Sequence, residues 1–160
     1  MESEWKPAII SDVATIHTAK ITPAQIDACN YISTDNMAPN LGGINGVSKL
    51  PTTGKITEYQ KGDVLFSNIR TYFKKVWLAE KNGGCSNDVI VFRPKAGIPA
   101  EYLYYILSSN DFINYTVTTS KGTKMPRGDK EAIIKYEFSL SPKDYRKNIT
   151  FKHIHSIKVR

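Results

Sequence analysis

Residues 62–70 read Gly-Asp-Val-Leu-Phe-Ser-Asn-Ile-Arg, and residues 88–92 read Asp-Val-Ile-Val-Phe. Each stretch begins with turn-forming residues and continues as β-branched and aromatic residues, which is the pattern of a buried strand. A third apolar run, Lys-Val-Trp-Leu-Ala, lies between them at residues 75–79. The spacing predicts an antiparallel meander of three strands. Pro94 is expected to end the last strand, because proline has no N–H for the ladder.

The segments around these strands predict short helices. Proline and an acid suit a first helical turn, so the sequence from Pro99 predicts one helix over about residues 99–108 and a shorter one over about 110–117. Thr22-Pro23 predicts a helix of about two turns. The expected fold is α+β, a single domain with small antiparallel or mixed β-sheets and a few short helices. Further expectations are a short strand followed by a turn or brief helix in 5–16, a turn at 82–84, extended chain over 132–140, and core positions Leu65, Trp77, Val89, Val91, Leu103 and Ile106.

Length and composition favour an ordinary globular domain. The chain has 160 residues, of which 41% are hydrophobic and 23% are charged. It contains no apolar run near the ~20 residues of a membrane helix and no apolar segment of a secretory signal. Its two cysteines, Cys29 and Cys85, form no CxxC pair. We therefore expect a cytoplasmic protein without membrane contact.

The net charge is unevenly distributed. The chain holds 22 Lys and Arg against 15 Asp and Glu, which gives +7. Residues 141–160 contain six of these basic residues and one acid, so this tail contributes +5 and the other 140 residues only +2. Because the body is only mildly basic, the position of the cations says more about nucleic-acid binding than the total charge does.

No motif for catalysis stands out. The glycines at 42–46 lack the lysine and the context of a phosphate loop, and the sequence contains no GxGxxG or HExxH. Cys85 has no histidine near it in sequence, so a packed thiol is the simpler interpretation. His153 and His155 could bind a metal from a strand, but a polar tail is the better interpretation. We expect no catalytic residues, metal or cofactor in this chain.

Three segments have the composition of a nucleic-acid contact. Residues 67–75, Ser-Asn-Ile-Arg-Thr-Tyr-Phe-Lys-Lys, combine cations, amides and aromatic rings without one acid. Residues 121–130 form a basic loop with two glycines and a proline, which could bind an anion through backbone N–H groups. Residues 33–55 are rich in Asn and Gly and are expected to be a loop. Each could equally be a solvated hairpin, a basic surface loop or a connector, but all three could converge on one duplex.

These segments also carry a family resemblance. Residues 31–37 (Tyr-Ile-Ser-Thr-Asp-Asn-Met), 62–70, 84–93 (Gly-Cys-Ser-Asn-Asp-Val-Ile-Val-Phe-Arg) and 121–130 (Lys-Gly-Thr-Lys-Met-Pro-Arg-Gly-Asp-Lys) occur in the order typical of one domain type. Together they resemble the target recognition domain of the DNA specificity subunit of type I restriction–modification systems. The resemblance covers about residues 5–140. We therefore expect a target recognition domain at 1–140 and a basic tail at 141–160 that departs from the family pattern.

The resemblance implies a protein that recognises a DNA sequence and does not catalyse a reaction. Such subunits carry two recognition domains, separated by long helices, and each reads one half of a bipartite target in double-stranded DNA. They recruit adenine-N6 methyltransferase subunits, which use S-adenosylmethionine, and restriction subunits, which use ATP and Mg. This chain resembles one domain only, so we expect a truncated subunit, with self-association as an open question. The residues expected to contact DNA are Asn36, Asn45, Ser67, Asn68, Arg70, Tyr72, Lys74, Lys75, Lys121, Lys124 and Arg127.

Other functions fit parts of the same sequence. A truncated interaction fragment would dock on modification or specificity subunits without touching DNA. A divergent metal-dependent nuclease is suggested only by residues 4–6, Glu-Trp-Lys, which lack a partner acid. An RNA-binding module remains open, because Tyr72 and Phe73 could stack on single-stranded bases.

Overall fold

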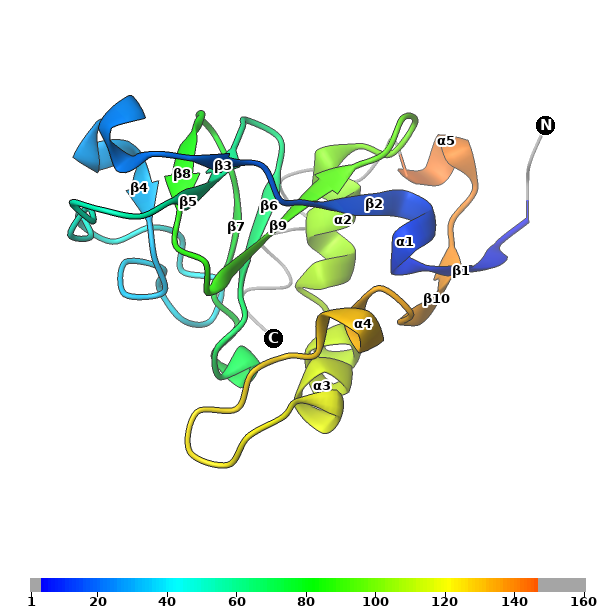
Figure 1. Ribbon diagram of the computed structural model, residues 1–160. Helices are drawn as coiled ribbons and strands as arrows, with labels where there is room; N and C mark the ends of the chain where they lie inside the picture. The colour runs from blue at the N-terminus through cyan, green and yellow to red at the C-terminus, as the bar shows by residue number, and fades with distance from the viewer. Residues whose placement is uncertain (1–3, 147–160) are drawn as a thin grey trace.

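The computed structural model describes residues 4–146 and shows an α+β domain, as predicted (Figure 1). Of the basic tail predicted at 141–160, the part from residue 147 onward, with His153 and His155, lies outside the described residues. The strands are β1 (Lys6–Ile9), β2 (Ala14–His17), β3 (Lys20–Ile21), β4 (Tyr31–Ile32), β5 (Ile56–Tyr59), β6 (Val64–Ser67), β7 (Val76–Leu78), β8 (Gly83–Cys85), β9 (Val89–Pro94) and β10 (Glu137–Leu140). The α-helices are α1 (Ile10–Val13), α2 (Ala100–Leu107), α3 (Asn110–Thr119), α4 (Lys130–Ile133) and α5 (Lys143–Arg146).

The predicted strands form the central sheet, but in a different order. Its four strands run β2-β9-β6-β7, and every neighbouring pair is antiparallel. The predicted meander would have placed β7 in the middle. Instead β6 pairs with both β7 and β9, with Leu65 opposite Trp77 on one side and Val91 on the other. The chain can return to the far side of β6 because β8, between β7 and β9, belongs to another sheet.

The second sheet has the order β3-β5-β8-β4 and contains one parallel pair, β4 with β8. The turn predicted at residues 82–84 is wrong at its second half, because Gly83 and Gly84 are buried in β8. Position 83 requires glycine because there is no room for a side chain. A Cβ on Gly83 would lie 2.2 Å from the carbonyl oxygen of Asn30 and 2.6 Å from the hydroxyl of Tyr59.

The helices α2 and α3 lie close to their predicted positions. The helix α2 packs against β6, β7 and β9 of the central sheet, and α3 follows below it, in contact with the 3₁₀ turn η3 (Thr71–Phe73) and α4 (Figure 1). The hydroxyl of Ser109 caps α3 by accepting from the N–H of Phe112 at 3.2 Å. The Phe112 ring is fully buried and meets Phe66 of the sheet edge-on at a centroid distance of 5.6 Å. It also meets Tyr136, just before β10, at 5.1 Å. Phe112 therefore joins α3 to the central sheet and to the residue that precedes the last strand.

The helix predicted from Thr22 is two separate 3₁₀ turns, η1 (Pro23–Gln25) and η2 (Ala28–Asn30). The side chain of Gln25 accepts from the N–H of Thr22 at 2.7 Å, which caps the start of the first turn. The turn ends because Ile26 already has an extended backbone, with φ of −132° and ψ of 160°. Extended chain was predicted over 132–140, but only β10 is a strand there, since α4 reaches residue 133. The predicted core positions are buried, apart from the partly exposed Trp77.

The strands β1 and β10 form a separate two-stranded ribbon. Lys6 lies opposite Leu140 and Ile9 opposite Glu137, in antiparallel register. The short strand predicted at the start of the chain is β1, and of the two alternatives after it, a turn or a brief helix, the structure has the helix α1. The first and last strands of the described chain therefore lie side by side at the same edge of the domain (Figure 1).

Candidate nucleic-acid interface

Two of the three candidate segments are joined by backbone contacts. The strand β6 ends at Ser67, and the chain beyond it pairs with the loop before α4 through a bridge between Ile69 and Arg127. The side-chain amide of Asn68 donates to the carbonyl of Gly128 at 3.0 Å, and the Gly128 N–H donates to the Asn68 carbonyl at 3.1 Å. A Cβ on Gly128 would lie 2.4 Å from the Asn68 amide oxygen, so this close approach needs a glycine.

The third segment, residues 33–55, joins the same cluster. The N–H groups of Asn40 and Leu41 donate to the carbonyls of Phe73 and Lys74 at 2.8 and 2.9 Å. The ammonium of Lys75 donates to the carbonyl of Thr34 at 2.8 Å. Figure 1 shows the chain around residue 72 and the loop of residues 120–129 at the lower end of the molecule. We call the surface formed by residues 34–45, 67–75 and 121–130 the three-loop surface.

A tight 3₁₀ turn, η3 (Thr71–Phe73), lies in the middle of the three-loop surface. It is flanked by Arg70 and Lys74, which both adopt the left-handed conformation with φ of 50° and 54°. The buried Thr71 contacts the Thr116 hydroxyl of α3 at 2.9 Å, which fixes the turn to the helical layer. Non-glycine residues rarely adopt this conformation, and such backbone is concentrated at functional sites.

The loop from residue 121 to 127 is closed by its own backbone. Lys121 and Arg127 exchange two N–H···O hydrogen bonds of 2.8 Å. The guanidinium of Arg70 reaches across and donates to the carbonyl of Lys124 at 3.2 Å. Arg70 also donates its backbone N–H to Pro126 at 2.9 Å. The loop is therefore held at its base and its centre, and it leaves Lys121, Lys124, Met125 and Arg127 exposed.

Two of the exposed cations have acidic partners that the sequence pattern does not indicate. The guanidinium of Arg127 lies 2.5 Å from the carboxylate of Asp88, which precedes β9. The ammonium of Lys121 lies 3.4 Å from Asp129. Desolvation alone would raise the pKa of Asp129, but the hydrogen bond from Lys121 and those from the first turn of α4 lower it below its usual value. Lys124 has no ion pair among the described residues.

The expected contact residues divide into two groups. Asn45, Tyr72, Lys121, Lys124 and Arg127 are exposed, whereas Arg70, Lys74 and Lys75 are partly covered. Lys74 donates to the side chain of Asn110. Asn36, Ser67 and Asn68 are buried. Asn36 accepts from the N–H of Ser33 at 2.8 Å, so it serves to shape the first loop.

Three buried polar atoms in the second segment have no hydrogen-bond partner within the structure described. They are the hydroxyl oxygen of Ser67, the amide oxygen of Asn68 and Nε of Arg70. Buried polar atoms are nearly always paired, so such a group calls for water or a ligand at that place. The three atoms lie within four consecutive residues, at the join between two loops of the three-loop surface.

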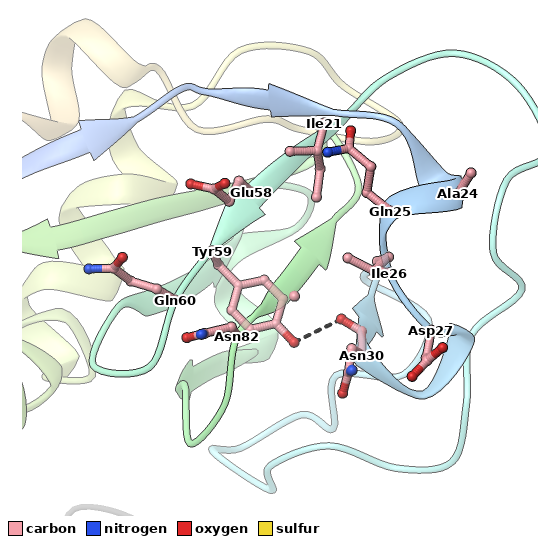
Figure 2. A pocket seen from close by; sticks show the side chains of 11 residues that line it. Ile21, Ala24, Gln25, Ile26, Asp27, Asn30, Glu58, Tyr59, Gln60 and Asn82 are labelled. Carbon is pink, nitrogen blue, oxygen red and sulfur yellow. Dashed lines mark hydrogen bonds between the residues drawn. The ribbon is translucent and has the colours of Figure 1, made fainter.

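A separate groove of about 510 Å³ lies on the second sheet and the 3₁₀ turns before β4 (Figure 2). Tyr59 lies in it and donates its hydroxyl to the carbonyl of Asn30 at 2.9 Å. Asp27 and Glu58 supply carboxylates to its wall. Glu58 already pairs with His17 at 3.2 Å. Within residues 4–146, no group of three or more His, Cys, Asp or Glu is placed to hold a metal ion.

The two cysteines should differ sharply in reactivity. Cys85 lies in β8, and burial raises its pKa to about 12, so very little thiolate forms near neutral pH. Cys29 is exposed. We expect a thiol reagent at pH 8 to modify Cys29 in the folded chain and to reach Cys85 only after unfolding. Mass spectrometry of the modified peptides, before and after denaturant, checks this, and equal rates at both positions would contradict it.

A model of the type I restriction modification DNA specificity domain matches residues 2–156 of the chain. The chain belongs to this family. A search of curated proteins found no match. None of the helices within residues 4–146 has the length and apolar character needed to cross a membrane.

Solved structures of specificity subunits share the fold. The HsdS subunit from Thermoanaerobacter tengcongensis superimposes with a TM-score of 0.75 at 20% identity, over 95% of this chain and 42% of that one. A structure described as the basis of complex assembly and conformational transition of the type I system gives 0.76 at 22% identity, over 98% and 42%. The S subunit from M. genitalium gives 0.57 at 14% identity, over 98% and 37%. The chain thus spans about two fifths of the first two proteins.

Proposed function

We propose that this chain binds double-stranded DNA through the three-loop surface and reads one half of a bipartite target for a type I restriction–modification system. The observation that carries the proposal is the meeting of three segments, far apart in sequence, in one cationic surface. Exposed Lys and Arg side chains on rigid loops suit phosphate contacts, and arginine and amide groups suit base edges. Family membership supports the same role.

The ion pairs on this surface can be exchanged for contacts with DNA phosphates. Arg127 and Lys121 each share their charge with a carboxylate that a phosphate can replace. The acids keep the loop in place before binding, and they reduce attraction to arbitrary polyanions. In this proposal Asp88 and Asp129 contribute selectivity against non-target binding, while Lys121, Lys124 and Arg127 supply affinity.

The chemistry of modification and cleavage belongs to partner subunits in this proposal. An adenine-N6 methyltransferase subunit would bring S-adenosylmethionine, and a restriction subunit would use ATP and Mg. The specificity chain itself would contribute recognition without catalysis, as specificity subunits of this family generally do.

Binding is tested by fluorescence anisotropy with a labelled duplex of mixed sequence, titrated at several salt concentrations. We expect binding that weakens linearly on a logarithmic plot against salt, because phosphate contacts release counterions. Unlabelled duplex should compete better than single-stranded RNA. Preferential competition by RNA would favour an RNA-binding module, and no retention on either nucleic acid would contradict the proposal.

The target is tested by co-expression with a modification subunit from the same source, followed by genome-wide mapping of adenine methylation. A new methylated motif that disappears when this chain is omitted is the expected result. Methylation that is unchanged by omission of the chain would contradict the proposed role in the system.

A further inference from the structure

An exposed aromatic pair marks the centre of the three-loop surface. Tyr72 and Phe73 are 48% and 40% exposed, and their ring centroids lie 4.8 Å apart. Met125, on the neighbouring loop, is 53% exposed. Singly exposed apolar side chains are common on protein surfaces, but an exposed pair of rings in mutual contact on a cationic surface is typical of an interaction site.

Backbone hydrogen bonds fix the turn that carries the aromatic pair. The N–H of Phe73 donates to the carbonyl of Arg70, and the N–H of Lys74 donates to that of Thr71, both at 3.0 Å. The carbonyl of Phe73 accepts from the N–H of Asn40 at 2.8 Å. The left-handed residues on both sides turn the chain sharply, and the two rings between them are exposed to solvent.

The angle between the rings favours a wedge over a stacking platform. Their planes are tilted by 54°, so they cannot together hold one flat base between parallel faces. The ammonium of Lys75 lies 5.9 Å from the centroid of the Phe73 ring and covers part of it. Two tilted rings, surrounded by the cations Arg70, Lys74 and Lys75, have the shape and charge of side chains that enter a base step of bent duplex DNA.

We propose that Tyr72 and Phe73 insert as a wedge into one base-pair step of the bound duplex and partly unstack it. This proposal rests on the proposed function and adds a second way of recognising the DNA sequence, through the deformability of a base-pair step. Part of the selectivity would come from how easily the contacted step opens, because pyrimidine–purine steps and mismatches unstack at lower cost. Phosphate contacts from the surrounding cations would hold the backbone on both sides of the opened step.

The test uses two short duplexes that differ only at one central pair, T·A or a T·T mismatch, each with 2-aminopurine beside it. We expect the wild-type chain to bind the mismatched duplex about five-fold more tightly and to raise the 2-aminopurine fluorescence, because the mismatch lowers the unstacking cost. The variant Tyr72→Ala/Phe73→Ala should bind both duplexes equally, without the fluorescence rise.

Two further variants separate the possible outcomes. Tyr72→Leu/Phe73→Leu should keep most of the mismatch preference, since leucine also acts as a wedge, whereas loss of the preference there would indicate aromatic stacking instead. Tyr105→Ala, an exposed tyrosine on α2, is the matched control and should behave as wild type. If the double alanine variant keeps both the mismatch preference and the fluorescence rise, the proposed insertion is wrong, but the proposed DNA binding is not affected. Absence of salt-dependent binding by the wild type overturns the proposed function as well.

Discussion

The variant Lys124→Ala/Arg127→Ala should bind duplex DNA roughly 60-fold more weakly than the wild-type chain at 0.1 M salt. Each phosphate contact contributes about 0.9 to the slope of log K against log salt, so two lost contacts reduce the slope by about 1.8. The electrostatic contribution vanishes near 1 M salt, so a slope smaller by about 1.8 corresponds to a roughly 60-fold loss of affinity at 0.1 M salt. Anisotropy titrations between low and moderate salt measure both quantities.

A charge-matched control distinguishes this surface from bulk charge. Lys61 precedes β6 and Lys95 follows β9, whereas the three-loop surface lies at the other ends of these two strands. At about 3.3 Å per strand residue, the controls lie about 15–20 Å away from the surface along the sheet. The variant Lys61→Ala/Lys95→Ala carries the same net charge and should lose far less affinity. Equal losses in the two variants would show that no particular face binds DNA.

The largest effect on stability is expected for Phe112→Ala, which should lower the free energy of unfolding by about 3–5 kcal/mol. The ring is fully buried and contacts Phe66 of the central sheet and Tyr136 beside β10. Its removal would leave a cavity where the helical layer, the sheet and the ribbon meet. Urea unfolding followed by circular dichroism gives the difference.

Val117 provides the comparison within the same helix. It lies on α3 but is 39% exposed, so Val117→Ala should change the free energy of unfolding by less than about 0.5 kcal/mol. If the two variants were equally stable, α3 would not be packed on the sheet as described. Because Thr116 of α3 also contacts Thr71, the phenylalanine variant should in addition weaken DNA binding.

Local signals made some elements predictable from sequence. Pro99 and Glu101 mark the start of α2, and the apolar runs of β6 and β9 are long enough to identify strands. The pairing order depended on contacts between distant segments. Gly83 looks like part of a turn, and only the approach of the Asn30 carbonyl shows why a strand needs glycine there.

In the candidate site, too, local composition was predictable from sequence, whereas contacts between distant residues were not. Composition identified the three basic or amide-rich segments, and the fold brings them together through backbone hydrogen bonds. The acidic partners were not predictable, because Asp88 meets Arg127 across 39 positions of sequence. Nor could composition reveal that Asn36 and Asn68 are enclosed by the loops they shape, since exposed and buried asparagines look alike in a sequence. Which residues contact DNA stays a prediction.

The pairing of Lys6 with Leu140 has a practical meaning for engineering and for evolution. A module whose entry and exit strands run side by side can be spliced into a longer polypeptide, or exchanged for another module, without pulling its sheets apart. Only a short connection is needed at the ribbon. Wholesale replacement of such a cassette is therefore mechanically simple.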